Sequence, residues 1–420
     1  MSRCFVVRGR LRPRWSGRAA LLSVLVGALA GCNLDALLDA ELPSQVERSD
    51  AEVPARAAQL VEGGIALFNC ALATHLLNGG LLGDELRDTG LSPTDARRVG
   101  TGEASPGGRC STHYQSLSQA RWVNDHVYEL LDGWSDADVP DRSGLMMKAA
   151  AYAGYTLILM GEAFCSMAID GGPELQPDAV FALAEERFTR VLDESAAGAG
   201  ATVHLARVGR ARARLNLGRH ADARADALLV PADFVATARF PATTQSNRNP
   251  LYTQQWEVNR YPVDWLYRDV RFAGVPDPRV NVVNRDIVNA QGDTIWAAVK
   301  YNQPGASVQL ATWEEAQLII AEAELKAGNL PAAVSAINAL HAKVSLPPFE
   351  SSDPEAIMEQ IIAERRAELF LEGHHLGDYR RYELPFVPPP GSPYPRRPEV
   401  YGDARCFPLP QSERDNNPNL

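Results

Sequence analysis

Helical periodicity is the feature that most restricts the fold of this chain. Apolar residues recur every three or four positions over most of 55–230 and of 310–373, as they do on the buried face of a helix. Asp353 followed by Pro354 is typical of a helix start, and Gly328 is typical of a helix end. The pattern predicts a mainly α-helical protein, with helices over 55–77, 114–131, 145–168, 179–196, 201–217, 219–229, 310–326, 330–344 and 354–373.

Two stretches resemble tetratricopeptide repeats, in which pairs of helices pack closely. They cover 178–230 and 310–344. Both place small side chains where two helices must approach each other, such as Ala206 and Gly209 in the first stretch and Ala321 in the second. We therefore expect a helical superhelix that contains tetratricopeptide-like helix pairs.

A loop-rich segment separates the two helical parts. Residues 231–309 contain many Pro, Asn, Tyr and Trp residues and show little helical period. Long ordered loops of this kind are usually functional, so we expect a large, irregular, ligand-binding part here. The tail from Pro385 is rich in proline, and we expect it to be extended and packed on the helical body.

The N-terminus has the pattern of an exported lipoprotein. Arginines without any acidic residue precede the apolar stretch 19–30. A membrane-spanning helix needs about 20 apolar residues, so this shorter stretch is interpreted as part of a signal peptide, and no later stretch of spanning length is expected to be free of charges. Leu29-Ala30-Gly31-Cys32 resembles a bacterial lipobox, which makes Cys32 the predicted lipid attachment site. The alternative is an ordinary signal peptide with a chance cysteine.

Charge and cysteine content narrow the possible partners and sites. The net charge is -11, and loss of the six arginines before Cys32 leaves 35 basic and 52 acidic residues, or -17; nucleic acid is therefore not an expected partner. No Cys-x-x-Cys pair occurs, so no metal site is expected. The cysteines of the mature chain allow up to two disulfides in three connectivities that remain open, and they are Cys70, Cys110, Cys165 and Cys406.

Three segments of the C-terminal third are similar to the SusD/RagB family of outer-membrane nutrient-binding lipoproteins. The first segment is Trp313-Glu314-Glu315-Ala316 with the following Leu318, Ile319, Ala321, Glu322 and Ala323, then Ile337, Asn338 and Leu340. The second is Glu364-Arg365-Arg366-Ala367-Glu368-Leu369 with Glu372-Gly373-His374 and Asp378-Tyr379-Arg380-Arg381. The third is Cys406-Phe407-Pro408-Leu409-Pro410-Gln411-Ser412-Glu413 with Asn417-Pro418-Asn419. The chain departs from the family at His375 and Gly377, where Arg and an aromatic residue are usual.

The resemblance implies a fold, a location and partners. It implies a SusD-like helical superhelix anchored by lipid to the outer membrane, on the cell surface, beside a SusC-like TonB-dependent transporter. The implied ligand is an oligosaccharide, or a peptide as in some members. The expected organisation is a signal peptide (1–31), an acidic tether (32–54), a helical part (55–230), a loop-rich insertion (231–309) and a helical C-terminal part with a proline-rich tail (310–420).

Sugar capture would use aromatic faces together with polar side chains that meet hydroxyl groups. The loop-rich segment offers Trp256, Tyr261, Trp265, Trp296, Asn259 and Arg260 as candidate ligand-binding residues. The acidic loop after the first helix, where the family often places a ligand-side loop, adds Asp84 and Glu85. Each aromatic residue taken alone is more often a packing residue than a ligand platform, but we expect one or two of the set to face ligand.

No catalytic residue, metal or cofactor is predicted. The chain lacks Gly-x-Ser-x-Gly, the phosphate-binding Gly-x-x-x-x-Gly-Lys-Ser/Thr pattern and His-Glu-x-x-His. Glu314 and Glu315 are neighbours on one predicted helix and cannot face each other across a cleft as glycosidase carboxylates do. The alternative function is a tetratricopeptide-type lipoprotein scaffold that binds a protein partner, which leaves the aromatic loops and the C-terminal segments unexplained.

Overall fold

The computed structural model of this chain describes residues 48–90, 97, 112–195 and 200–420. The predicted lipid attachment site Cys32 and the cysteine Cys110 lie outside the described residues. The chain divides into two compact units, 1–51 and 52–420. The short helix α2 (Arg48–Ala51) belongs to the first unit, and all other elements named below belong to the second.

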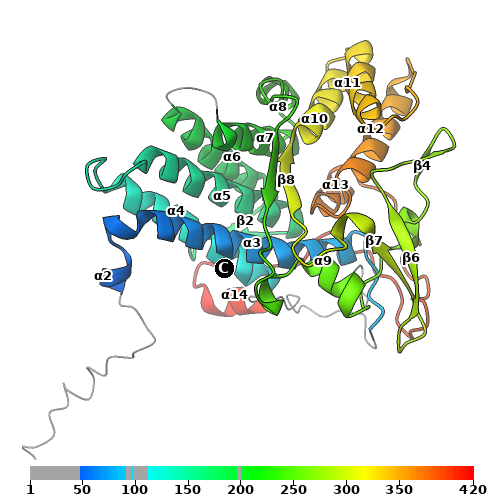
Figure 1. Cartoon of the computed structure of the whole chain (residues 1–420), viewed down its shortest axis with the longest axis horizontal. Coiled ribbons are helices and arrows are strands. Elements are labelled where there is room, and N and C mark those ends of the chain that lie inside the picture. The colour runs from blue at the N-terminus through cyan, green and yellow to red at the C-terminus, as the bar shows by residue number, and fades with distance from the viewer. Residues whose placement is uncertain (1–47, 91–96, 98–111, 196–199) are drawn as a thin grey trace, which may run out of the picture. The chain divides into compact units, whose positions relative to one another are not determined.

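The second unit is mainly helical, as predicted (Figure 1). Its longer helices are α3 (Ala57–Leu82), α4 (His113–Asp132), α5 (Arg142–Ala163), α6 (Pro177–Glu194), α7 (Ala201–Asn216), α8 (His220–Ala227), α10 (Trp313–Lys326), α11 (Leu330–Lys343), α12 (Pro354–Glu368), α13 (His375–Arg381) and α14 (Gln411–Asn416). Short helical turns are η1 (Pro54–Arg56), η3 (Gln245–Asn247), α9 (Pro250–Tyr252), the π-helix η4 (Thr253–Glu257), η5 (Trp265–Tyr267) and η6 (Val299–Tyr301). The strands are β1 (Met167–Ala168), β2 (Glu174–Leu175), β3 (Val235–Ala238), β4 (Arg271–Phe272), β5 (Val275–Pro276), β6 (Val282–Val288), β7 (Thr294–Ala298) and β8 (Val308–Thr312).

Helices α3 to α7 pack neighbour against neighbour in sequence order (Figure 1). Small residues make this close approach possible. A methyl group added at Gly154 of α5 would lie 2.8 Å from the Phe188 ring of α6, and one added at Gly209 of α7 would lie 2.3 Å from it. The ring of Phe188 is fully buried between these two glycines, which explains the small residues that the sequence places at this helix pair.

A second group of helices, α10 to α12, continues the body beyond α8 (Figure 1). The predicted helix over 310–326 begins three residues late, because Val308–Thr312 forms β8 and pairs antiparallel with β3. The Thr312 side chain then caps α10 by accepting a hydrogen bond from the Glu315 amide at 3.1 Å. Strand pairing thus replaces the first residues of the predicted helix.

Helix α5 also ends earlier than the sequence pattern predicts. It stops at Ala163 instead of 168, because the next residues pair with the C-terminal tail. Phe164 forms a parallel bridge with Phe407, and Cys165 forms a disulfide with Cys406. Of the three connectivities that the sequence left open, this bond fixes one pair. Cys70 is disulfide-bonded as well.

Helix α3 is the most apolar long helix among the described residues. Together with η1 it spans residues 54–82 and is, by length and composition alone, long and apolar enough to cross a membrane. This corrects the expectation that no later stretch of spanning length is free of charges. Half of its most apolar window is buried inside the protein, and the helix packs against α4 and α5, as a core helix does.

The loop-rich segment 231–309 contains more regular structure than its composition suggests. It includes the turn of helix at 250–257 and the antiparallel hairpin of β6 and β7. The hairpin is interrupted by a register shift between Asn284 and Val288. The strands of this hairpin and the helical turn are short. They therefore leave no sustained period in the sequence of this segment.

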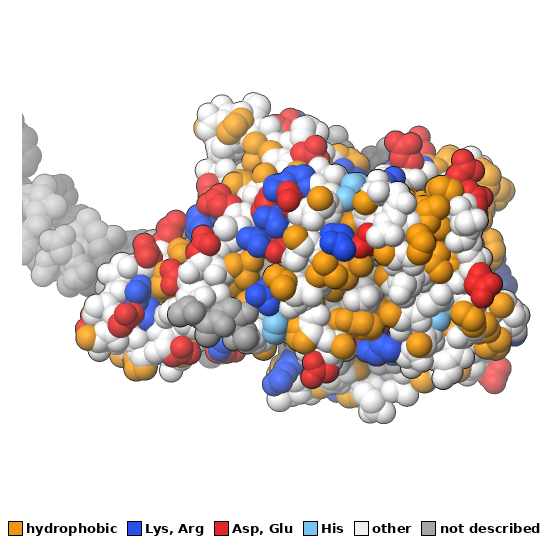
Figure 2. All heavy atoms as spheres, turned by 90° about the horizontal axis from the view of Figure 1, so that it is seen from above, with side chains coloured by type: hydrophobic (Ala, Val, Ile, Leu, Met, Phe, Trp, Pro, Cys, Tyr) orange, Lys and Arg blue, Asp and Glu red, His pale blue; other side chains and the backbone are white. Residues whose placement is uncertain are grey.

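The surface carries charges of both signs close together. On the face that Figure 2 shows, basic and acidic side chains lie next to one another. Ion pairs of this kind join helices α6 to α8, including Arg210–Asp226 at 2.7 Å and Arg214–Glu185 at 2.8 Å. Arg210 and Arg214 are therefore neutralised locally.

Candidate ligand-binding site

The structure brings together the two segments that the sequence analysis proposed separately. The loop after α3 runs beside the aromatic segment through an isolated bridge between Leu86 and Val263. Two further backbone bonds hold it there: the Arg87 amide donates to the Pro262 carbonyl at 3.0 Å, and the Asp264 amide donates to the Glu85 carbonyl at 2.9 Å. Two segments more than 170 positions apart in the sequence thus lie side by side.

Side chains reinforce this junction. The exposed Arg260 guanidinium pairs with the buried Asp88 carboxylate, with Nε to Oδ1 at 3.2 Å. The Thr89 hydroxyl donates to the Arg260 carbonyl at 2.6 Å and accepts from the Asn289 amide at 2.7 Å. Arg87 pairs with Asp293 at 2.8 Å. The loop is therefore fixed to both ends of the aromatic segment.

The C-terminal tail also contacts the loop after α3, which was not expected from the sequence. The Tyr394 hydroxyl donates to the Asp88 carbonyl at 2.9 Å. Arg397 donates through Nε to the Gly90 carbonyl and through Nη2 to the Thr89 carbonyl, both at 2.6 Å. Proline-rich extended tails give no periodic signal that would reveal such long-range contacts.

The carboxylates of Asp84 and Glu85 face protein groups. Asp84 accepts from Arg97 Nε at 3.0 Å, and the Glu85 carboxylate accepts from the Leu371 amide at 2.7 Å. Burial raises the pKa of each carboxyl to about 7, although the neighbouring Arg97 opposes the rise at Asp84. The two residues hold the loop on the core, and direct contact of either with a ligand stays a prediction.

The predicted aromatic residues differ in accessibility. Trp265 is 50% exposed, on a 3-10 turn that begins with Asp264, whose side chain accepts from the Leu266 amide. Trp256 and Trp296 are partly buried, and each ring has an arginine over it: Arg285 at 4.7 Å and Arg268 at 5.1 Å from the ring centroids. Trp265 is therefore the indole of this set that offers the most ring surface.

The remaining predicted residues lie around these rings. Tyr261 is partly buried, with the Arg260 guanidinium 4.9 Å from its ring centroid. Asn259 has a positive φ of 58°, a conformation that asparagine adopts more readily than most residues. Its Oδ1 accepts from Arg285 Nη1 at 2.7 Å. Arg285 and Arg268 were missed as neighbours of the tryptophans because their contacts cross between strands and loops.

A small cavity of about 170 Å³ lies behind the loop. Asp84 and Leu266 line it together with Arg366, His375 and Tyr379 from the C-terminal helices. Burial lowers the pKa of His375 to about 4, so the imidazole is neutral at neutral pH. Within the described residues, no cluster of three or more His, Cys, Asp or Glu side chains could hold a metal ion.

Comparison with known proteins places the chain in a structural context. Residues 315–420 match the SusD family. A SusD-like carbohydrate binding protein from Bacteroides vulgatus is similar, with a TM-score of 0.65 and 15% identity over 88% of this chain and 97% of that protein. A SusD superfamily protein from Parabacteroides distasonis gives 0.66 and 12%, over 90% and 99% of the two chains. Another from Bacteroides fragilis gives 0.65 and 13%, over 88% and 99%.

No curated protein matches the sequence. At these identities the structural likeness concerns the fold, and it extends over nearly the whole length of the solved proteins. The predicted SusD-like helical architecture is confirmed.

Proposed function

We propose that this chain, which has the SusD-like fold and matches the SusD family over residues 315–420, is a lipid-anchored outer-membrane protein that binds an oligosaccharide. It passes this nutrient to a SusC-like TonB-dependent transporter and catalyses no reaction. The observation that carries the proposal is the junction of the loop after α3 with the aromatic segment, where the half-exposed Trp265 lies beside fixed polar groups.

The chemistry of this junction suits a sugar. A pyranose presents a C–H face that packs on an aromatic ring and hydroxyl groups that need both donors and acceptors. Trp265 offers the ring, and the guanidinium of Arg260, which is 47% exposed and bound to Asp88, is a polar group of the same segment. Asp84 and Glu85 contribute by holding the loop in place. A site held by so many internal bonds loses little conformational freedom on binding.

Oligosaccharide binding is tested with a glycan array and then by calorimetry on the glycan that is captured. Trp265→Ala should weaken its binding by about 1 to 3 kcal/mol, because a stacked ring is lost. Trp122→Ala is the matched control, since Trp122 is 46% exposed on α4, away from the site segments. Equal binding by the parent chain and both variants would remove Trp265 from the site, and capture of no glycan at all would contradict the proposal.

Delivery to a transporter is tested by affinity purification of the native complex from gently solubilised cells, with a C-terminal tag. Recovery of a large TonB-dependent barrel in near-equal amount is the expected result. The alternative function, a scaffold for a protein partner, is favoured by the packed pairs α7–α8 and α10–α11. Recovery of other proteins without a barrel would support that alternative.

A further inference from the structure

A second hollow lies on the helical body. It has a volume of about 490 Å³ and is bounded by the end of α5, the start of α6, the end of α7 and the helix α13. None of its wall residues belongs to the segments of the candidate ligand-binding site. We call it the α5–α6 groove, and its polar wall residues are Glu162, Gln176, Asp178, Asn216, Arg380 and Arg381.

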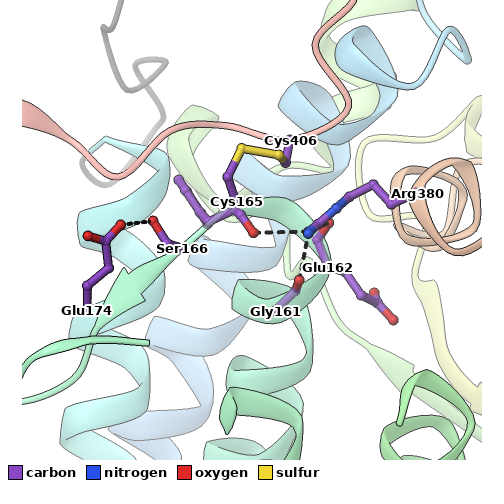
Figure 3. Close-up of a disulfide and its surroundings, with 8 residues drawn as sticks. Gly161, Glu162, Cys165, Ser166, Glu174, Arg380 and Cys406 are labelled. Atoms are coloured by element: carbon purple, nitrogen blue, oxygen red, sulfur yellow. Dashed lines mark hydrogen bonds between the residues drawn. A yellow bond between two sulfur atoms is a disulfide. The ribbon is translucent and has the colours of Figure 1, made fainter. Parts of the chain in front are cut away.

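The guanidinium of Arg380 is fixed at one side of this groove. Figure 3 shows the side chain reaching from α13 to the end of α5, beside the Cys165–Cys406 disulfide. Its Nη1 donates to the carbonyls of Gly161, Glu162 and Phe164 at 2.9, 3.2 and 3.0 Å. Its Nε and Nη2 donate to no described residue, and no described carboxylate lies within ion-pair distance of it. Nη1 of the guanidinium is therefore anchored, and Nε and Nη2 are available to donate to a ligand.

Some of the other charged side chains of the groove have ion-pair partners, and others do not. The Glu162 carboxylate accepts from Arg212 Nε at 2.8 Å and from the Asn216 amide at 3.0 Å. Arg381 is paired with Glu322 and Asp378. Among the described wall residues, Arg380 and Asp178 are left as one cation and one anion without an ion-pair partner. The groove thus has local charges of both signs and no excess of either.

Amide groups complete the set of donors and acceptors. The Gln176 side chain is exposed and makes no hydrogen bond with a described residue, and Asn216 keeps its Oδ1 as an acceptor. Gly377 packs tightly against Glu162, because an added methyl group would lie 2.9 Å from Glu162 Cδ. A side chain at this position would collide with Glu162.

The start of α6, which presents Gln176 and Asp178, is held in place. The hairpin of β1 and β2 leads directly into α6, and its Glu174 carboxylate accepts from the Ser166 hydroxyl (Figure 3). Ser166 follows the disulfide-bonded Cys165, so the hairpin is anchored to the end of α5. The backbone that carries Gln176 and Asp178 is therefore fixed before a ligand binds, which reduces the entropy cost of binding.

We infer that the α5–α6 groove is a second sugar subsite, which takes a neutral saccharide unit. Hydroxyl groups of the sugar accept from the free edge of Arg380 and donate to Asp178, while Gln176 and Asn216 offer both donor and acceptor atoms. A neutral ligand is favoured because the two unpaired charges, Arg380 and Asp178, balance each other, so a polyanion would gain one cation and meet one uncompensated anion. This inference rests on the proposed function, since it assumes that the chain binds glycans.

The test compares the parent chain with Asp178→Ala and Gln176→Ala, using an array of neutral and uronate-containing oligosaccharides and calorimetry on each captured glycan. Both replaced side chains are exposed, so the fold should be retained. Asp193→Ala is the matched control, because Asp193 is an exposed aspartate on the same helix, outside the groove. We expect at least one neutral glycan to bind Asp178→Ala about tenfold more weakly or worse, from the loss of a charged hydrogen-bond acceptor, with no change in Asp193→Ala.

The outcomes separate this inference from the proposed function. Glycans that bind the parent chain, Asp178→Ala and Gln176→Ala equally well would overturn the groove as a subsite and leave the proposed function intact. Binding restricted to uronate-containing glycans and weakened by Asp178→Ala would overturn the neutral class. Absence of any glycan binding by the parent chain would contradict the proposed function and the subsite together.

Discussion

Trp256 is more buried than Trp265, and we expect it to contribute to stability. Trp256 is partly buried, its Nε1 donates to the Ala298 carbonyl at 3.4 Å, and Arg285 covers its ring. We expect Trp256→Ala to lower the free energy of unfolding by about 1 to 3 kcal/mol, because the packing and the covering cation are lost. Denaturant titration measures this. An unchanged midpoint with lost glycan binding would instead place Trp256 in contact with ligand.

Glu315 is a buried acid whose ionisation opposes folding. Burial raises its pKa to about 7, while the Arg212 guanidinium, 3.9 Å from Oε1, opposes the rise. The folded chain therefore holds this proton in a range where the unfolded chain has lost it, between about pH 4 and pH 7. Stability should fall as pH rises through this window, since the folded state must either keep the proton or accept a buried charge.

Glu315→Gln removes the free-energy cost of burying an ionised carboxylate at this position. The variant should be more stable than the parent at pH 8, on the order of 2 kcal/mol, and the two should converge near pH 4. Unfolding midpoints at several pH values measure the difference. Burial also raises the pKa of Asp84 and Glu368 to about 7, so the variant should retain part of the parent's slope. A variant that is less stable than the parent at pH 8 would show that the charged carboxylate supports Arg212.

At the scale of elements, the disulfide ties the C-terminal tail to the end of α5. Cys165 and Cys406 are 241 positions apart, and the Cys165 amide donates to the Phe407 carbonyl at 2.8 Å. A crosslink that closes a long loop restricts the unfolded chain, which is typically worth about 2 to 4 kcal/mol. The paired variant Cys165→Ala with Cys406→Ala should therefore unfold at lower denaturant concentration than the parent.

The backbone pairing at Phe164 and Phe407 should survive in this paired variant, because both rings are buried. Limited proteolysis then distinguishes two results. Slow cleavage of the tail in the folded variant would confirm that packing holds the segment and that the disulfide acts on the unfolded chain. Rapid cleavage near residue 406 would mean that the crosslink itself keeps the tail in place.

Most helices could be predicted from the sequence, whereas their ends and partners could not. Helices α4 and α7 begin and end within one residue of the predicted ranges, because strong periodicity and local punctuation define them. The errors at 164–168 and 310–312 share a cause. In both places, pairing with a strand or tail more than 70 positions away overrides the local helical pattern.

At the scale of the whole molecule, the site could be predicted as two sets of residues and not as one surface. The aromatic segment and the acidic loop were each recognised by composition, but only the fold shows that Asp264 and Glu85 are joined by a backbone hydrogen bond. The tail residue Arg397 was missed because its role depends on contacts with Thr89 and Gly90, about 300 positions earlier. Single-sequence patterns carry no information on such contacts.

Anchoring of the whole molecule through a lipid on Cys32 stays a prediction. If the lipobox is functional, cells grown with labelled palmitate should label the parent chain and not Cys32→Ser, which should be recovered away from the outer membrane because stable anchoring needs more than one acyl chain. Cys4→Ser is the matched control, because Cys4 lies in the predicted signal peptide and its replacement should not affect labelling.

The Cys32→Ser variant separates the effect of membrane anchoring from the effect of glycan binding. The purified Cys32→Ser chain should bind glycans as the parent does, because neither the proposed site in residues 84–90, 256–296 and 394–397 nor the α5–α6 groove includes Cys32. Growth on the captured glycan should nevertheless fall, since a released binding protein cannot remain beside a transporter. Normal growth with Cys32→Ser would mean that the chain reaches its partner through protein contacts alone, and normal palmitate labelling would exclude Cys32 as the lipid attachment site.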